Sequence, residues 1–200
     1  MNLFDKHPWT SPDAFVAPSA SVIGDVDINM KSSVMYGAVV RGDLSKVDIG
    51  GYTTIGDRAV VYTAETVEGH PEARTVIGDY VVVGAGAMLQ SCTIERGAKI
   101  GAGAVVMEGA LVEADAELAP GTVVHPGRRI PSGEVCVGNP CTKERDLTKT
   151  EIGQHEPDAE ALSAVAAEHS HEFLPYSNAY QQAEALGLSG GADLEASLKK

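Results

Sequence analysis

Histidine is the side chain most able to bind a metal or move a proton near neutral pH, and here the histidines are scattered. His70 stands among glutamates in a polar stretch, so it could serve as a metal ligand or a general base, although a solvated loop histidine is the simpler interpretation. His125 has no carboxylate near it in sequence, which favours a structural role. His169 and His171 are two positions apart, so a helix would point them in different directions. Local spacing therefore predicts no histidine cluster.

The cysteines give no familiar pattern either. Cys92, Cys136 and Cys141 form no even set for a disulfide framework and contain no CxxC pair, and two thiols alone do not make a zinc site. We expect them to be reduced, with Cys92 buried as a small apolar side chain. The sequence also lacks a nucleophile elbow, a P-loop and a dinucleotide-binding motif in a strand–helix context.

The most prominent group of polar side chains consists of Arg41, Asp43 and Asp57. An arginine and an aspartate on the same flank can form a bidentate ion pair. Such a pair would be either a surface ion pair within the chain, which contributes little stability, or part of a contact between subunits.

Aliphatic residues recur at every sixth position, and this repeat defines the elements that must position these side chains. A helix repeats every 3.6 residues and a strand every two, so a period of six fits neither. It is typical of short strands joined by regular corners and wound into a parallel β-helix, here with about six turns of three strands each. The residues on this period are Val16, Val22, Ile28, Val34, Val40, Ile49, Ile55, Val61, Ile77, Val83, Leu89, Ile94, Ile100, Val106, Val112, Leu118, Val124 and Ile130, and Cys136 continues it.

Interruptions of the period predict where the coil is modified. Ten extra residues separate Val61 from Ile77, so residues 62–75 should project as a loop, and loops that leave a solenoid often carry function. Three extra residues separate Val40 from Ile49. The step from Leu89 to Ile94 is one residue short, which predicts a tight corner.

The composition divides the chain into four segments. We expect an N-terminal extension (1–14), a β-helix domain (15–145), a C-terminal helical segment packed on the coil (146–188) and a flexible tail (189–200). Pro157 is predicted to start a first helix, and a second helix is predicted over 178–187. In the first helix, Leu162, Val165, Ala166 and His169 share a face that would lie on the coil.

Charge and hydropathy exclude several classes of function. The net charge is −13 and no cluster of Lys and Arg occurs, so a surface for nucleic acid or anionic membrane is not expected. The longest apolar run is about half the length of a membrane span. The first residues have neither the apolar core of a secretion signal nor the Arg-rich character of a transit peptide.

Four stretches together resemble the gamma-class carbonic anhydrases over residues 15–145: VMYGAVVRGDLSKVDIG, YTTIGDRAVVY, VIGDYVVVGAGAMLQSCTI and HPGRRIPSGEVCVGNP. The resemblance implies a left-handed β-helix, a trimer about a threefold axis and a C-terminal helix along the coil. It also implies a zinc site between neighbouring subunits with three histidine ligands.

All three histidine positions are substituted here, by Tyr62, Ala85 and Gln90, and Gly56 replaces a glutamine of the family. Zinc needs three protein ligands and an open fourth position, which a methyl group, a phenol and a neutral amide do not supply. The resemblance therefore implies no catalytic residue and no metal ligand in this chain. Zinc would be held only between partner subunits.

The residues implied to form the trimer interface are retained, as Arg41, Asp43 and Asp57. The stretch HEFLPYSNAY at 171–180 further resembles the carbonic-anhydrase-like subunits of mitochondrial complex I. This implies an assembly role in NADH:ubiquinone oxidoreductase, peripheral on the matrix side of the inner membrane. The implied partners are two gamma carbonic anhydrase subunits in a heterotrimer, membrane-arm subunits and a lipid contact, with no nucleic acid.

Three alternatives stay open. The chain could be an active gamma carbonic anhydrase with other ligands, such as His70 or His125. It could be a hexapeptide acyltransferase, which shares the coil, with His70 as base and coenzyme A between coils. It could also be a soluble homotrimer with a different binding function.

Overall fold

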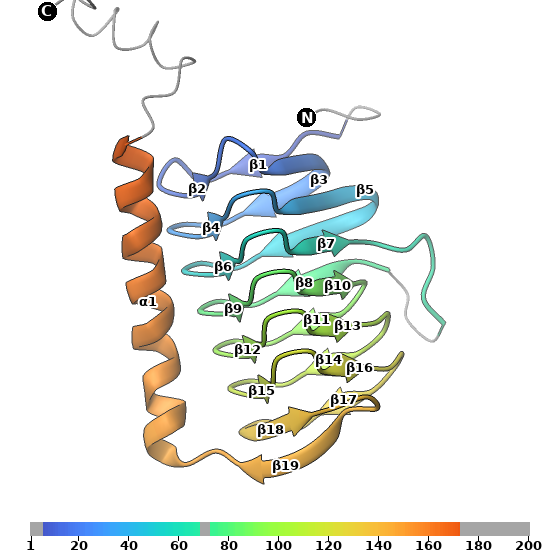
Figure 1. Cartoon of the computed structure of the whole chain (residues 1–200). Coiled ribbons are helices and arrows are strands. Elements are labelled where there is room, and N and C mark those ends of the chain that lie inside the picture. The colour runs from blue at the N-terminus through green and yellow to red at the C-terminus, as the bar shows by residue number, and fades with distance from the viewer. Residues whose placement is uncertain (1–5, 69–72, 173–200) are drawn as a thin grey trace, which may run out of the picture. The chain divides into compact units, whose positions relative to one another are not determined.

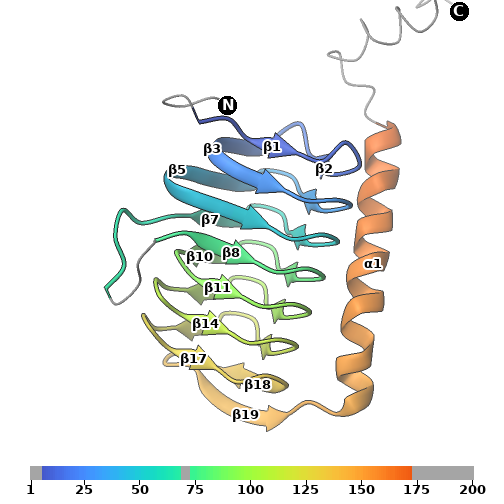
Figure 2. The same ribbon diagram turned by 180° about the vertical axis from the view of Figure 1, so that it is seen from behind.

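Two opposite views of the protein show a stack of short strands wound into one coil, with a long helix beside it (Figure 1, Figure 2). The computed structural model describes residues 6–68 and 73–172. Residues 1–167 form one compact unit, and the described residues after it, 168–172, are the last turn of the helix. The elements are β1 (Trp9–Thr10), β2 (Phe15–Val16), β3 (Ser21–Ile28), β4 (Ser33–Val34), β5 (Val39–Ile49), β6 (Thr54–Ile55), β7 (Val60–Tyr62), β8 (Thr75–Ile77), β9 (Val82–Val83), β10 (Met88–Gln90), β11 (Thr93–Ile94), β12 (Lys99–Ile100), β13 (Val105–Val106), β14 (Leu111–Val112), β15 (Glu117–Leu118), β16 (Val123–Val124), β17 (Arg129–Ile130), β18 (Glu134–Val137), β19 (Thr142–Asp146) and α1 (Lys149–Glu172).

The strands form three outer faces, and every strand except β19 pairs in parallel with strands one coil away. The β9 face contains β2, β4, β6, β9, β12, β15 and β18. The β10 face contains the first parts of β3 and β5, then β7, β10, β13 and β16. The β11 face contains β1, the second parts of β3 and β5, then β8, β11, β14 and β17. The expected parallel β-helix is confirmed, and the seven parallel strands of the β9 face give it one turn more than predicted, because β18 starts another turn.

The core is the column of side chains that the six-residue period places inside the coil. Strand alternation turns Val61, Leu89 and Val106 inward, where they are fully buried, and turns their neighbours Val60 and Met88 outward. Small buried residues such as Ala87 and Ala104 lie between the aliphatic residues in the same core. The packing leaves little room between coils. A Cβ on Gly50 would lie 2.4 Å from the carbonyl carbon of Gly78, so glycine is required there.

The interruptions of the six-residue period differ in their effect on the structure. The connection from β7 to β8 extends away from the coil, as predicted (Figure 1). The three extra residues before Ile49 instead lengthen β5 into a continuous strand that stays paired with β3. The predicted tight corner is at Ser91, whose backbone has φ of +40°. The coil ends where β19 turns back and pairs antiparallel with β18.

The predicted start of the first helix, at Pro157, is wrong. α1 begins at Lys149, and Pro157 lies inside it. The start is set by a capping box: Thr148 Oγ1 accepts a hydrogen bond of 3.3 Å from the Glu151 amide, and the Glu151 carboxylate accepts one of 2.8 Å from the Thr148 amide. The predicted second helix at 178–187 and the tail lie outside the described residues.

The predicted buried face of the helix is also wrong in part. Ala166 is buried, but Leu162 and Val165 are 39% and 47% exposed. The buried side instead carries His155, Ala159, Ser163 and Ala166. Small and hydrogen-bonding side chains are favoured there because α1 lies close to the corners of the coil. His155 Nδ1 is 2.8 Å from the Gly97 carbonyl oxygen, and Ser163 Oγ donates a hydrogen bond of 2.7 Å to the Lys31 carbonyl oxygen.

Within the described residues, no helix is long and apolar enough to cross a membrane.

Candidate functional site

Tyr62 and Gln90 lie side by side on the β10 face. They are Cα partners at the ends of β7 and β10, and Arg41 of β5 is the Cα partner of Tyr62 on its other side. The Tyr62 hydroxyl donates a hydrogen bond of 2.9 Å to Gln90 Oε1 and lies 3.9 Å from Met88 Sδ. Two of the three substituted positions are thus adjacent on successive coils, and their polar groups satisfy each other.

Ala85 belongs to a different edge of the coil. It lies in the corner between β9 and β10, where its methyl group is exposed. The length of β10 separates this corner from Gln90, which corresponds to roughly 10 Å at about 3.3 Å per residue. A single chain therefore does not bring Ala85 together with Tyr62 and Gln90.

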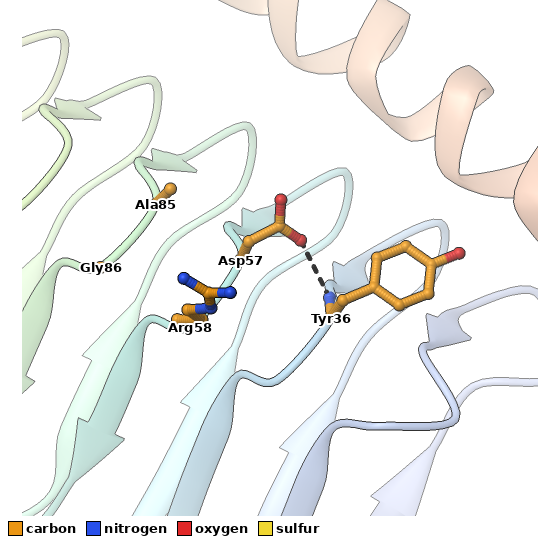
Figure 3. A pocket seen from close by; sticks show the side chains of 5 residues that line it. All are labelled: Tyr36, Asp57, Arg58, Ala85 and Gly86. Atoms are coloured by element: carbon orange, nitrogen blue, oxygen red, sulfur yellow. Dashed lines mark hydrogen bonds between the residues drawn. The ribbon is translucent and has the colours of Figure 1, made fainter.

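An open pocket of about 560 Å³ lies at the Ala85 corner, lined also by Tyr36, Asp57, Arg58 and Gly86 (Figure 3). Asp57 Oδ1 accepts a hydrogen bond of 3.0 Å from the Tyr36 amide, which ties two successive corners together. In Figure 3 the Arg58 side chain lies next to Asp57 and below it, and Ala85 lies on the following corner. The only charged groups among these lining residues belong to Asp57 and Arg58.

Arg41 and Asp43 form an ion pair within the chain. Partial burial raises the pKa of the Asp43 carboxyl, but hydrogen bonds from Arg41 and from the Leu44 amide outweigh it and leave the pKa below its usual value. The Arg41 side chain is 51% exposed, so it also remains accessible to a neighbouring molecule. The role of Arg41, Asp43 and Asp57 at a trimer contact stays a prediction.

The Ser91 hydroxyl links both ends of the projecting loop to the coil by hydrogen bonds. Its buried hydroxyl accepts a hydrogen bond of 2.7 Å from the Ala64 amide and donates one of 2.6 Å to the Ala73 carbonyl oxygen. The two ends of the loop are thereby held at one point, beside Gln90. His70 lies outside the described residues, so its predicted alternatives as a ligand or a base stay predictions.

The remaining candidate residues are dispersed. His125 is exposed, with Nε2 3.2 Å from Asn139 Oδ1. All three cysteines are free and buried, which confirms the predicted burial of Cys92. Burial raises the pKa of the Cys92 thiol to about 12, and burial together with the neighbouring Cys141 thiol raises the pKa of Cys136 to about 12. Among the residues that the structure describes, no three His, Cys, Asp or Glu side chains come together as a metal site.

The donor set at the three substituted positions does not fit zinc. Tyr62 offers a phenol that already donates to Gln90, and Gln90 offers a neutral amide oxygen that already accepts from Tyr62. Ala85 offers no donor atom. A catalytic zinc site takes three side chains from the set of histidine, cysteine and carboxylate, and none of these types is present at the three positions.

Sequence identity to curated relatives shows the family to which the chain belongs. The chain is 37% identical over 142 residues to the probable carbonic anhydrase of Methanocaldococcus jannaschii, covering 71% of this chain and 86% of that protein. It is also 42% identical over 184 residues to gamma carbonic anhydrase-like 1, mitochondrial, of Arabidopsis thaliana, covering 92% of this chain and 73% of that protein. The chain belongs to the gamma carbonic anhydrase family.

Other comparisons agree with this membership. The chain is 44% identical over 172 residues to gamma carbonic anhydrase 2, mitochondrial, of Arabidopsis thaliana. The matched region is 86% of this chain but 62% of that longer protein. Among solved structures, a hexapeptide transferase family protein from Anaplasma phagocytophilum superposes with a TM-score of 0.77 at 34% identity, covering 82% of this chain and 94% of that one. This likeness confirms the left-handed coil. No family model matches the sequence.

Sequence reasoning missed the contact between the substituted positions in this gamma carbonic anhydrase homologue. The signal was present, because Tyr62 and Gln90 each follow an inward aliphatic residue of the period, and strand alternation turns both outward. The double role of Ser91 and the burial of His155 had no comparable signal, since both depend on segments distant in sequence.

Proposed function

We propose that this gamma carbonic anhydrase homologue is a non-catalytic, structural subunit. It acts in the assembly of mitochondrial complex I, as one member of a matrix-facing heterotrimer with two gamma carbonic anhydrase subunits. The observation that carries the proposal is the hydrogen bond from Tyr62 to Gln90. The two side chains are neutral and satisfy each other, and the resemblance in sequence implies metal-binding histidines at these two positions.

Loss of the ligands affects more than one site in such a trimer. Tyr62 and Gln90 lie at one edge of the β10 face and Ala85 lies at another edge, so each site between neighbours takes residues from two chains. One chain with substituted positions then removes the two sites to which it contributes. A site between the other two subunits keeps all its ligands, which fits a scaffold beside catalytic relatives.

The relatives support the cellular assignment. Gamma carbonic anhydrases 1, 2 and 3 and both gamma carbonic anhydrase-like proteins of Arabidopsis thaliana carry "mitochondrial" in their names. The alignment with the like proteins extends over 92% of this chain, against 86% for the others. We infer the same compartment here, and the inner-membrane, matrix-side position follows from the proposed place in complex I.

Metal content tests the proposal directly. The purified chain and the triple variant Tyr62→His/Ala85→His/Gln90→His are dialysed against a weak chelator, and bound zinc is measured by mass spectrometry. We expect the wild-type chain to retain almost no zinc and no CO2 hydration activity, and the triple variant to gain about one zinc per chain because it restores three ligands.

The double variant Tyr62→His/Gln90→His is the matched control, because it lacks the third ligand and should hold zinc more weakly. Wild-type chain that retains about one zinc, or that hydrates CO2, would overturn the proposal. Blue-native electrophoresis of mitochondrial membranes tests the assembly role, with comigration with complex I as the expected result and migration solely as a free trimer as the contrary one.

A further inference from the structure

The core of the coil ends in two cysteines. Cys136 continues the six-residue period on β18 and is the Cα partner of Leu118 in the preceding turn. Cys141 comes directly before β19, and its amide donates a hydrogen bond of 3.0 Å to the carbonyl oxygen of Val123. Both side chains belong to the core cluster and are buried, with exposures of 2% for Cys136 and 0% for Cys141. In chain order they are its last two members, so they close the core at this end of the coil.

The turn between β18 and β19 brings the two thiols together. Only residues 137–140 separate the cysteines in the chain, and the antiparallel pairing of Val137 with Thr142 folds the chain back between them. Burial first, and then a hydrogen bond between the two thiols, raises the pKa of Cys136 to about 12. Two cysteine sulfur atoms in contact within a short hairpin are an arrangement from which a disulfide forms with little backbone movement.

A disulfide fits this pair better than a zinc ion. Zinc in structural sites takes four ligands, and among the described residues no third His, Cys, Asp or Glu side chain joins the two thiols. A disulfide requires the two sulfur atoms alone. Cys92 is not a competing partner, because it is buried at the corner between β10 and β11, and two complete turns of the coil, β12–β14 and β15–β17, lie between it and β18. The pairing is therefore between Cys136 and Cys141.

The end of the coil is also where a buried thiol can become accessible. β19 is the edge strand of its sheet, and all of its residues, Thr142–Asp146, are exposed. The turn at 137–140 is exposed as well. Edge segments with few buried contacts open locally before the rest of a structure does. Detachment of β19 from β18 would uncover Cys141 while the other turns of the coil stay paired.

We propose that Cys136 and Cys141 are a site of reversible oxidation, at which a disulfide within the chain locks β19 to β18 and closes the end of the coil. The oxidant is a low-molecular-weight disulfide such as oxidised glutathione. The inference does not depend on the proposed function, because it uses neither the substituted positions at Tyr62, Ala85 and Gln90 nor a partner chain.

The exchange proceeds in two steps that balance in atoms and electrons. After β19 opens, one cysteine loses its proton and its thiolate attacks a sulfur atom of glutathione disulfide, whose S–S bond breaks to release one glutathione thiolate. The second cysteine thiolate then attacks the protein sulfur of this mixed disulfide and releases the other glutathione thiolate. The cysteine pair is oxidised by two electrons, glutathione disulfide is reduced by two, and the two cysteine protons end on the two glutathione thiols.

Oxidation would also hold the start of α1 in place. β19 leads directly into this helix, and Arg145 on β19 pairs with Glu151 in the first turn of α1. A disulfide that closes a loop this short restricts the open state, which makes the opening of β19 about 30-fold rarer. The lock therefore steadies the junction from which α1 leaves the coil.

Thiol counting tests the proposal. The full chain is equilibrated with oxidised glutathione, with and without mild urea to open the coil end, then unfolded in excess maleimide, and its labels are counted by mass spectrometry. The reduced chain offers three thiols, and we expect the oxidised chain to take one label, on Cys92. Cys92→Ala is the matched control and should still form the disulfide, whereas Cys141→Ala should form none. Circular dichroism establishes that each variant is folded, and Cys136→Ala replaces Cys141→Ala if the latter is not.

Trypsin measures the lock itself. Lys143 and Arg145 are exposed on β19, but cleavage after them requires β19 to detach from β18. We expect this cleavage to be about 30-fold slower in the oxidised chain, while cleavage after Arg74, at the end of the projecting loop, keeps its rate. A wild-type chain that keeps three labelled thiols, a disulfide that includes Cys92, or an oxidised chain whose β19 is cut as fast as in the reduced chain would overturn the proposal.

Discussion

The Tyr62 hydroxyl donates a hydrogen bond to the side-chain oxygen of Gln90 across two successive coils, at 2.9 Å. The resemblance to the gamma carbonic anhydrase pattern implies histidines at both positions. In this chain they make a direct contact with each other, and the coil beneath keeps its packing, with Val61 and Leu89 fully buried.

A double-mutant cycle on this pair should give a measurable coupling. Tyr62→Phe and Gln90→Ala each remove the hydrogen bond, and the double variant should be more stable than the sum of the single effects predicts. We expect a coupling of about 0.5–1 kcal/mol, because both side chains are half-exposed. Urea denaturation measures it. Additive effects would show that the contact contributes nothing to stability.

Ser91→Ala should loosen the projecting loop. The variant leaves the Ala64 amide and the Ala73 carbonyl without the hydroxyl that joins them, which costs about 1–3 kcal/mol for buried polar groups. Limited proteolysis should then cut the β7–β8 connection faster than in the wild type. Ser21→Ala, at an exposed position of β3, is the control and should cleave at the wild-type rate.

Neighbouring residues of β11 should differ sharply in their effect on stability. Ile94 is fully buried and points into the coil, so Ile94→Ala should lower the free energy of unfolding by about 2–5 kcal/mol. Thr93 is exposed, and Thr93→Ala should change it by less than about 1 kcal/mol. Thermal or urea unfolding distinguishes the two, and equal effects would contradict the inward and outward assignment.

Acid should weaken the start of α1 through Glu151. Hydrogen bonds from Arg145, and then from Thr148, lower the pKa of the Glu151 carboxyl from 4.5 to about 2. Because the folded pKa is the lower one, the stabilisation is present above pH 4.5 and is lost as the pH falls toward 2. Stability measured from pH 5 to pH 2.5 should fall more steeply for the wild type than for Glu151→Gln.

Salt provides the control for this titration. The Glu151 side chain is partly exposed, so its ion pair with Arg145 is screened, and the difference between wild type and Glu151→Gln should shrink at about 1 M salt. A difference that persists unchanged at high salt would show that the capping hydrogen bonds with Thr148, rather than the charge of Arg145, carry the effect.

The helix shows where local reasoning reached its limit. Pro157 is a valid helix-start signal, but the Thr148–Glu151 capping box lies earlier and set the observed start. The apolar residues Leu162 and Val165 predicted a buried face, yet α1 turns His155 and Ser163 toward the coil. The choice depends on backbone carbonyls of Gly97 and Lys31, which are presented by corners far away in sequence.

The sequence by itself determined the coil and its projecting loop, because a six-residue period and its interruptions are local properties that can be read position by position. Tertiary structure alone decided which side chains meet: Tyr62 with Gln90, and Ser91 with both ends of the loop. These contacts join different turns, and their alignment depends on the summed length of every corner, strand and insertion between them.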